Sequence, residues 1–271
     1  MMRLAWLTDI HLNFVDGLTM QRFFESVAEQ ADALAISGDI AEGHSVYHYL
    51  RSIDETIKKP VYFVLGNHDF YRGSISQVRR LVAEVAGESE HLRYLTALNV
   101  EQLTPKTAIA GHDGWADGRL GDYDHSEVIL NDHLLIAELA VCWNGVNLEK
   151  QKLRPILMGL ADEAARHFEK VLEAAASEYP NVIAVSHVPP FREAAWYQGK
   201  PSSDDFLPYF AGKAAGDVMV KVMKAHPQSD LLVLCGHTHD GGEIQVLDNL
   251  RVLTGEAEYG KLRINRILPV E

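Results

Sequence analysis

The sequence predicts an α/β protein in which parallel sheets are covered by helices. Short apolar runs of four to six residues, rich in β-forming side chains and bounded by Gly or Pro, recur along the chain. Such runs are typical of strands buried on both faces. Helical patterns separate the runs in the first third of the chain, and this alternation favours parallel strands joined by helical crossovers. Several of the runs are followed, directly or after one glycine, by Asp, His or Asn.

The first third of the chain supplies three strand–helix pairs. LAWLT, ALAIS and VYFVL are the apolar runs, and each precedes a segment in which apolar residues recur at helical spacing. Residues 90–110 then add one or two further strands. We expect strands over 4–8, 33–37 and 61–65, and helices over 19–31, 44–58 and 74–86.

The regular alternation is interrupted twice later in the chain. Residues 112–158 form a long excursion rich in Gly and Asp, with a helical pattern near 126–140, and residues 189–212 form a second one. Long polar excursions in compact domains are usually functional or mobile. Because no linker is visible, we expect one domain over 1–271 with insertions near 112–158 and 189–212. The remaining expected elements are helices 159–179 and 213–225, strands 182–186 and 231–235, and a β-meander of 244–247, 250–254 and 262–268.

Composition and charge exclude several classes of protein. The chain has 271 residues and a formal net charge of −13, which argues against long nucleic acid as a partner because phosphate contacts need clustered Lys and Arg. Two isolated cysteines give no disulfide framework or thiolate metal site. No apolar run approaches transmembrane length, and the first strand begins at once, so we expect no signal peptide, no membrane association and a cytoplasmic location.

Six of the apolar runs end where a metal-ligating or catalytic residue type begins. Ligands in open α/β sheets bind beyond the carboxyl ends of the strands, so these residues can converge. Carboxylates and imidazoles together suit Mn, Fe or Zn, and the pattern therefore predicts a catalytic metal site. The residues are Asp9 and His11, Asp39, Asn67 and His68, His112 and Asp113, His187, and His237 and His239.

Each of these residues has an ordinary structural interpretation when it is taken alone. Asp39 is suited to a turn or a helix N-cap, the Asp9–His11 pair is weak evidence of a metal site, and a lone histidine is more often structural. Metal binding is indicated by their joint occurrence, in this order, each after a strand.

The chain resembles the calcineurin-like metallophosphoesterase superfamily, whose signature is DxH…GD…GNH[DE]…H…GHxH. All five blocks are present between residues 9 and 239, as DIH, GDIAEG, GNHD, SHVPP and GHTH. The resemblance implies a four-layer α-β-β-α sandwich of two mixed sheets, with a dinuclear metal site at the carboxyl ends of the strands. It implies two metal ions, whose identity among Mn, Fe and Zn stays open.

The resemblance also implies a role for each motif residue. Asp9, His11, Asp39 and His239 would hold one metal, and Asp39, Asn67, His187 and His237 the other, with Asp39 bridging. A metal-bridging hydroxide would be the nucleophile. His68 would be the general acid, since a histidine near its ordinary pKa can deliver a proton at neutral pH.

One departure from the family pattern concerns the phosphate clamp. The protein-phosphatase branch has an Asp and then an Arg where this chain has Glu42 and Gly43. Glu42 is still expected to orient His68. Arg72 and Arg192 are candidates to replace the missing Arg, although a surface position is the simpler interpretation of each.

The expected function is hydrolysis of phosphate esters, either phosphomonoesters or small phosphodiesters, with a small phosphorylated substrate as the partner. A nuclease or cyclic-nucleotide phosphodiesterase with the same metals is the alternative, and a non-catalytic metal-binding scaffold is a further one. The oligomeric state stays open. The two insertions should decide specificity, and their aromatic residues Trp115, Phe191, Trp196 and Tyr197 either line the substrate site or seal the insertions onto the core.

Overall fold

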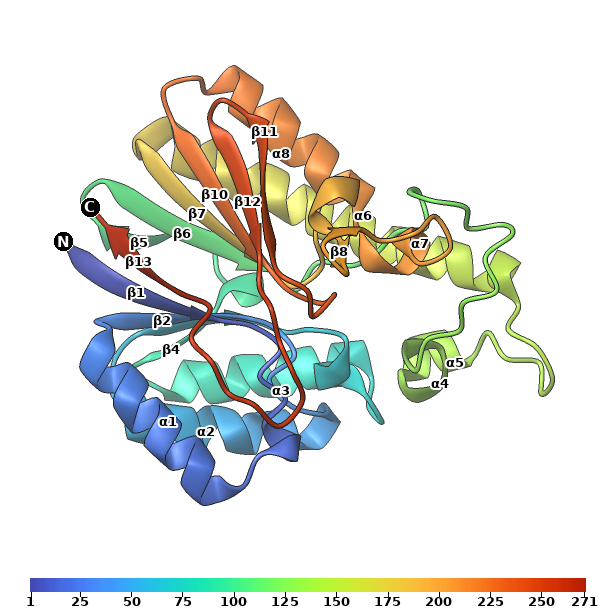
Figure 1. Ribbon diagram of the computed structural model, residues 1–271, viewed down its shortest axis with the longest axis horizontal. Helices are drawn as coiled ribbons and strands as arrows, with labels where there is room; N and C mark the ends of the chain where they lie inside the picture. The colour runs from blue at the N-terminus through green and yellow to red at the C-terminus, as the bar shows by residue number, and fades with distance from the viewer.

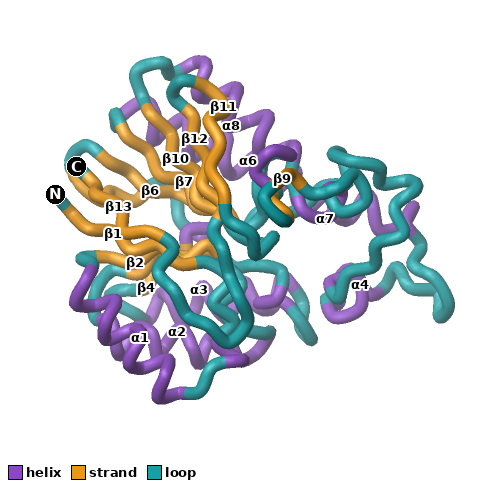
Figure 2. The backbone as a smooth tube through the Cα atoms, in the orientation of Figure 1, coloured by secondary structure: helices purple, strands orange, loops and turns teal.

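Two β-sheets face each other at the centre of the molecule, and helices cover their outer faces (Figure 1). The computed structural model covers residues 1–271. The arrangement is the four-layer α-β-β-α sandwich that the sequence resemblance implied. Figure 2 shows the strands of both sheets between two layers of helix, with a large, mostly loop-built projection on one side.

The first sheet has five strands in the order β13-β1-β2-β3-β4, of which only β13 is antiparallel to its neighbour. Its outer face is covered by three crossover helices. The strands are β1 (Met2–Leu7), β2 (Ala33–Ser37), β3 (Val61–Val64), β4 (Leu92–Tyr94) and β13 (Arg266–Val270), and the helices are α1 (Gly17–Gln30), α2 (Val46–Ile57) and α3 (Ile75–Glu88).

The second sheet has six strands in the order β11-β12-β10-β7-β6-β5, with parallel central strands and an antiparallel strand at each edge. Two long helices pack on its outer face. The strands are β5 (Glu101–Thr104), β6 (Thr107–His112), β7 (Asn181–Ser186), β10 (Asp230–Cys235), β11 (Gly242–Leu247) and β12 (Leu250–Thr254), and the helices are α6 (Lys150–Glu178) and α8 (Lys213–Ala225).

The buried strands alternate between two different cores. In β1, Leu4 and Trp6 point to the core between the sheets, whereas Ala5 and Leu7 point to the core under α1 and α2. Successive side chains of a strand face opposite sides of the sheet, so a strand that is apolar at every position is buried on both faces. This explains why the sequence shows continuous apolar runs instead of alternating ones.

The last strand does not join the expected meander. β11 and β12 pair as expected, but β13 crosses to the other sheet and runs antiparallel to β1, with Leu268 and Val270 in the core between the sheets. Pro269 is tolerated because β13 is an edge strand. The alternating burial of a short strand does not reveal which sheet edge it will join.

Two other expectations need correction. Residues 90–112 hold three strands, β4, β5 and β6, instead of one or two. Helix α6 begins at Lys150, nine residues before the expected start, and contains Pro155. A proline normally ends or kinks a helix, but Leu153 and Leu157 on either side of it are buried in the core, and this packing stabilises the additional turns.

The two insertions contact each other at one side of the molecule (Figure 1). The backbone amide of Gly118 donates to Pro208 O at 3.0 Å, and the amide of Asp122 donates to Asp204 O at 2.8 Å. The insertions contain the short helices α4 (Asp132–Leu135), α5 (Ala137–Ala140) and α7 (Leu207–Phe210) and the hairpin of β8 (Trp196–Tyr197) and β9 (Lys200–Pro201).

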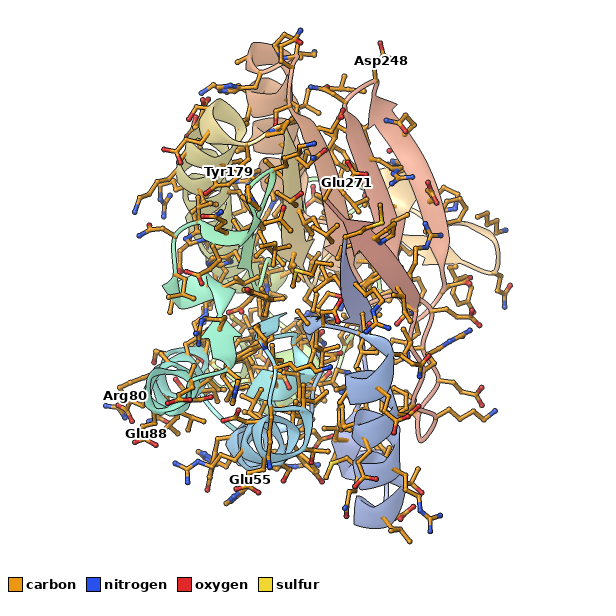
Figure 3. All side chains as sticks on the ribbon, turned by 90° about the vertical axis from the view of Figure 1, so that its left-hand side faces the viewer. Glu55, Arg80, Glu88, Tyr179, Asp248 and Glu271 are labelled. Carbon is orange, nitrogen blue, oxygen red and sulfur yellow. The ribbon has the colours of Figure 1, made fainter.

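The opposite end of the molecule carries the two chain termini and outward-pointing charged side chains. Figure 3 shows Glu55, Arg80 and Glu88 on α2 and α3 pointing away from the sheets. None of the helices, including the 29-residue α6, combines the length and apolar character needed to cross a membrane.

Candidate metal centre

The loops that follow five strands meet at the carboxyl ends of the two sheets. Backbone hydrogen bonds hold the first two loops together, because Asp9 N donates to Gly38 O at 3.1 Å and His11 N donates to Asp39 O at 3.0 Å. The other sheet joins them through His237, whose backbone amide lies 3.1 Å from both carboxylate oxygens of Asp9. The site is thus built across the junction between the sheets.

Backbone strain is concentrated at this junction. Eight non-glycine residues have a positive φ angle, and five of them are predicted metal ligands. Left-handed conformations are unfavourable for residues with a Cβ, and where they persist at a functional site the surrounding structure must enforce them. The five are Asp9, His11, Asp39, His237 and His239.

Four predicted ligands form a first group, namely Asp9, His11, Asp39 and His239, each with a ligand atom within 4.8 Å of the others. The Nε2 atoms of His11 and His239 lie 3.1 Å apart. His239 Nε2 lies 3.4 Å from Asp9 Oδ1, and His11 Nε2 lies 3.7 Å from Asp39 Oδ2. All four side chains predicted for one metal therefore point at a common position.

The other predicted ligands form a second group around the Asn67 side chain. Asn67 Oδ1 lies 3.0 Å from His187 Nε2 and 2.9 Å from His237 Nδ1. These two nitrogens lie 3.2 Å apart, and His187 Nε2 lies 3.5 Å from Asp39 Oδ1. The two carboxylate oxygens of Asp39 thus face different groups, which is the arrangement that a bridging ligand requires.

Backbone carbonyls fix the orientation of two of the imidazoles. His187 Nδ1 lies 2.9 Å from Ser37 O, and His237 Nε2 lies 3.0 Å from Tyr209 O. A carbonyl can only accept, so the ring nitrogen facing it carries the proton. The other nitrogen of each ring then presents its lone pair to the second group, as metal-ligating histidines usually do.

The Asn67 side chain is oriented by residues that the sequence pattern does not indicate. Its Nδ2 donates to Asp132 Oδ1 at 2.8 Å, and the Tyr71 hydroxyl donates to the same oxygen at 2.7 Å. Asp132 belongs to α4 in the first insertion and is buried. These bonds place the amide nitrogen on the outside, so Asn67 Oδ1 points to the histidines. No motif marks Asp132, which lies 65 residues from Asn67.

The electrostatics of the groups fit bound cations. Burial lowers the pKa of His11 to about 3 and that of His237 to about 4, so both imidazoles are neutral at pH 7 with a lone pair free for a metal. Burial and the neighbouring Asp9 raise the pKa of Asp39 well above its usual range. Clustered carboxylates in a buried site need compensating positive charge. Neutral imidazoles, carboxylates and one amide oxygen therefore form a donor set that suits bound metal ions.

Two glycines allow the loops to approach this closely. Gly38 has a φ of +91°, and a Cβ there would lie 2.5 Å from His187 Nδ1. Gly66 has no positive φ, but a Cβ at this position would collide with Asp39 Oδ1. Close packing against the bridging carboxylate is therefore the reason for glycine at position 66.

A buried carboxylate holds the second and third loops in place. Asp69 accepts hydrogen bonds from the backbone amides of Gly66 and Ala41, both at 2.8 Å, and from that of Ile40 at 3.2 Å. Asp69 is the last residue of the GNHD block, and the sequence pattern assigns it no separate role. Its contacts show that it fixes the loop backbone on either side of Asp39.

His112 and Asp113, although they follow a strand end as the ligand-type residues do, belong to neither ligand group, and neither they nor Trp115 line the cavity described below. All three are buried. Asp113 accepts hydrogen bonds from Arg79 Nε and the Tyr94 hydroxyl, both at 2.8 Å, and from Leu65 N at 2.8 Å. The segment therefore has a structural role, because it ties the end of β6 to the loop after β3.

His68 lies beside the first group, with Nε2 4.0 Å from Asp39 Oδ2 and its ring stacked on Tyr71 at a centroid distance of 4.2 Å. It faces the pocket described below. Burial lowers the pKa of His68 to about 4, against the smaller opposing effect of Asp132. This pKa is lower than the ordinary value from which the role of His68 as a general acid was expected.

The charged residues expected to clamp the phosphate or to orient His68 form other ion pairs. Glu42 forms an ion pair with Arg72, so it is engaged away from His68, and Arg192 pairs with Asp204 at 2.6 Å. Neither arginine lines the pocket.

A cavity of about 690 Å³ opens onto both groups. Asn67, His68, His237 and His239 line it, together with residues of both insertions. Among the aromatic residues singled out in the sequence, Tyr197 lines the cavity, whereas Trp115, Phe191 and Trp196 do not. Phe206 and Phe210 of the second insertion and Tyr259, between β12 and β13, also line it.

Comparison with solved structures identifies relatives of this fold. A phosphopantetheinyl hydrolase from Mycobacterium tuberculosis is 16% identical with a TM-score of 0.62, over 95% of this chain and 89% of the other. A dimetal phosphatase from Danio rerio is 16% identical with a TM-score of 0.57, over 94% and 87% of the two chains. At these identities the likeness shows the fold alone. A sequence search of curated proteins finds no match.

The family assignment comes from the sequence itself. Residues 2–241 match the family model for calcineurin-like phosphoesterases, and this range contains all five motif blocks and the strands that carry them. The chain belongs to the calcineurin-like phosphoesterase family.

Proposed function

We propose that this protein is a dinuclear metal-dependent hydrolase of small phosphate esters, either monoesters or diesters. One observation carries the proposal: seven side chains of ligand type form two adjoining groups that share the carboxylate of Asp39. Two metal ions bound there would activate water and neutralise charge on the phosphoryl oxygens. The 690 Å³ cavity above them is of the size that small-molecule sites have.

The chain's own residues would then position the ester and supply a proton. His68 lies beside the shared carboxylate and faces the cavity, so we assign to it proton donation to the leaving oxygen, with the negative charge of the bound ester raising its pKa from about 4. Asp132 and Tyr71 hold the Asn67 amide, and Ser37 and Tyr209 hold the histidine rings. Such support keeps the ligands in place without rearrangement during turnover.

The test begins with the metal content of the purified protein and of the Asp39→Asn variant. Wild type should hold close to two metals per chain after loading. Asp39→Asn should lose both, because the carboxylate faces both groups. Asp124→Asn, which changes an exposed carboxylate of the first insertion, should retain both. A full metal complement in Asp39→Asn would refute the bridging assignment.

Turnover of p-nitrophenyl phosphate and bis(p-nitrophenyl) phosphate after metal loading separates the remaining possibilities. Diester selectivity would favour the phosphodiesterase alternative, and monoester selectivity would favour a small-molecule phosphatase. Two bound metals with no hydrolysis of either ester, or of unactivated alkyl esters, would instead support a non-catalytic scaffold.

A further inference from the structure

Aromatic residues from two separate segments of the chain line the cavity above the metal ligands. We define the aromatic walls as Tyr197, Phe206 and Phe210 from the second insertion, together with Tyr259 from the segment between β12 and β13. None of the four belongs to a family motif block. They therefore lie outside the set of residues predicted to hold the metals.

The rings from the second insertion and the ring of Tyr259 contact different ligand groups. The ring centroid of Phe206 lies 5.3 Å from that of Phe210, and the Phe210 centroid lies 5.2 Å from that of His237, in the second group. The ring centroid of Tyr259 lies 4.5 Å from that of His11 and 5.0 Å from that of His239, in the first group. A phosphate held by both groups would therefore place its organic substituent between the two walls.

The walls keep much of their aromatic surface open to solvent. Tyr197 is 53% exposed, Tyr259 48% and Phe206 41%. Residues that merely sealed the insertions onto the core would be covered, as Tyr209 of α7 is at 3% exposure. Exposed aromatic residues gathered in one concave site indicate a ligand surface.

The charges of the cavity exclude several substituents. Lys200 is the only lysine or arginine that lines it, and Asp132, the only acid, is bonded to Asn67 and Tyr71. A cationic substituent would find no free acid, and a second phosphate or a carboxylate would find only one exposed lysine, Lys200, and no arginine fork, so neither charge is well matched. The substituent that fits is uncharged.

We propose, building on the function assigned above, that the aromatic walls select esters whose phosphate carries a planar, uncharged ring. Aromatic side chains gain extra stabilisation from offset-stacked or edge-to-face contact with another π system, beyond the apolar area buried. An aliphatic ring of the same size gains only the area. Planarity, rather than hydrophobicity, is thus the property that the walls recognise.

Two phosphonates of matched size test this selectivity by direct binding. Benzylphosphonate and cyclohexylmethylphosphonate share the anionic head group, and their C–P bonds are not hydrolysed by an esterase. Calorimetric titration of the metal-loaded wild type should show about 2- to 12-fold tighter binding of benzylphosphonate, the range expected for one aromatic pair. Simple hydrophobic binding predicts the opposite order, because the cyclohexyl group is the more apolar.

Variants of the aromatic walls test whether these residues cause a preference for benzylphosphonate. Tyr197→Leu/Phe206→Leu keeps apolar bulk but removes two rings, and it should bring the two affinities within about 2-fold. Leu134→Ala, an exposed apolar residue of the first insertion outside the cavity, should keep the wild-type preference. Equal affinities in wild type, or an unchanged preference in the double variant, would overturn the inference.

Methylphosphonate separates this inference from the function on which it rests. If methylphosphonate binds the metal-loaded protein, or an ester is hydrolysed, and no ring preference appears, only the inference fails. If no phosphonate binds and no ester is hydrolysed, the proposed function fails and the inference fails with it.

Discussion

The proposed role of His68 as proton donor can be tested by comparing substrates whose leaving groups differ in their need for a proton. His68→Ala should keep both metals, because the side chain lies outside the two ligand groups. It should lower kcat for alkyl esters by ~10²–10⁴, the usual contribution of a positioned acid, and much less for nitrophenyl esters, whose leaving groups need no proton.

The measurement is steady-state turnover of one alkyl and one nitrophenyl ester, with metal content determined in parallel. His125→Ala removes an exposed histidine whose partner is Asp122 in the first insertion, and it serves as the control. Equal losses on the two esters would show that His68 does not act as a proton donor.

Single residues of the site differ in how far the sequence reveals them. The seven ligand-type residues and His68 stand at strand ends within short motifs, so the sequence alone indicates their types and positions. It does not indicate Asp132, because its partner Asn67 lies on another loop and the pairing depends on how the insertion folds back. Nor does it indicate the low pKa of His68, which follows from burial.

At the scale of elements, α4 supports the loop after β3 through one carboxylate. Asp132→Ala should free the Asn67 amide to rotate, because the bond to Asn67 Nδ2 is lost. Removing such a supporting partner typically lowers metal affinity by about 10- to 100-fold. The loss should affect only the metal of the second group, so dialysed protein should retain one metal.

Metal analysis after dialysis against a dilute chelator measures this difference. Asp124→Ala removes an exposed carboxylate of the same insertion and should keep two metals. Loss of both metals, or of neither, in Asp132→Ala would contradict the assignment of Asp132 to one group.

The long parallel elements are predictable because their burial makes them apolar throughout. Strands β1, β2, β3, β7 and β10 lie within a few residues of their predicted positions. Elements that depend on distant partners are not predictable in this way: β13 joins β1 instead of a meander, and α6 continues past Pro155 because Leu153 and Leu157 are buried by neighbouring elements. The local sequence pattern predicts an element well when the element's own side chains decide how it is buried, and poorly when distant partners decide its position.

At the scale of the whole molecule, the candidate metal centre joins the two sheets. Asp9, Asp39 and Asn67 follow strands of the first sheet, whereas His187, His237 and His239 follow strands of the second. The sheets also share an apolar core of 14 buried residues. Metal binding at the junction should therefore stabilise the packing of one half of the molecule on the other.

Removing the metals should lower the melting temperature of the entire molecule in one transition. Ligands that bind only the folded state stabilise it by RT ln(1 + [L]/Kd), about 2.7 kcal/mol per site at a hundredfold excess over Kd. The metals would also neutralise the buried charge that raises the pKa of Asp39. Calorimetry across a metal titration should show Tm rising with the logarithm of concentration in wild type and staying flat in Asp39→Asn. A metal-independent Tm in wild type, or separate transitions for the two sheets, would show that the centre does not join them energetically.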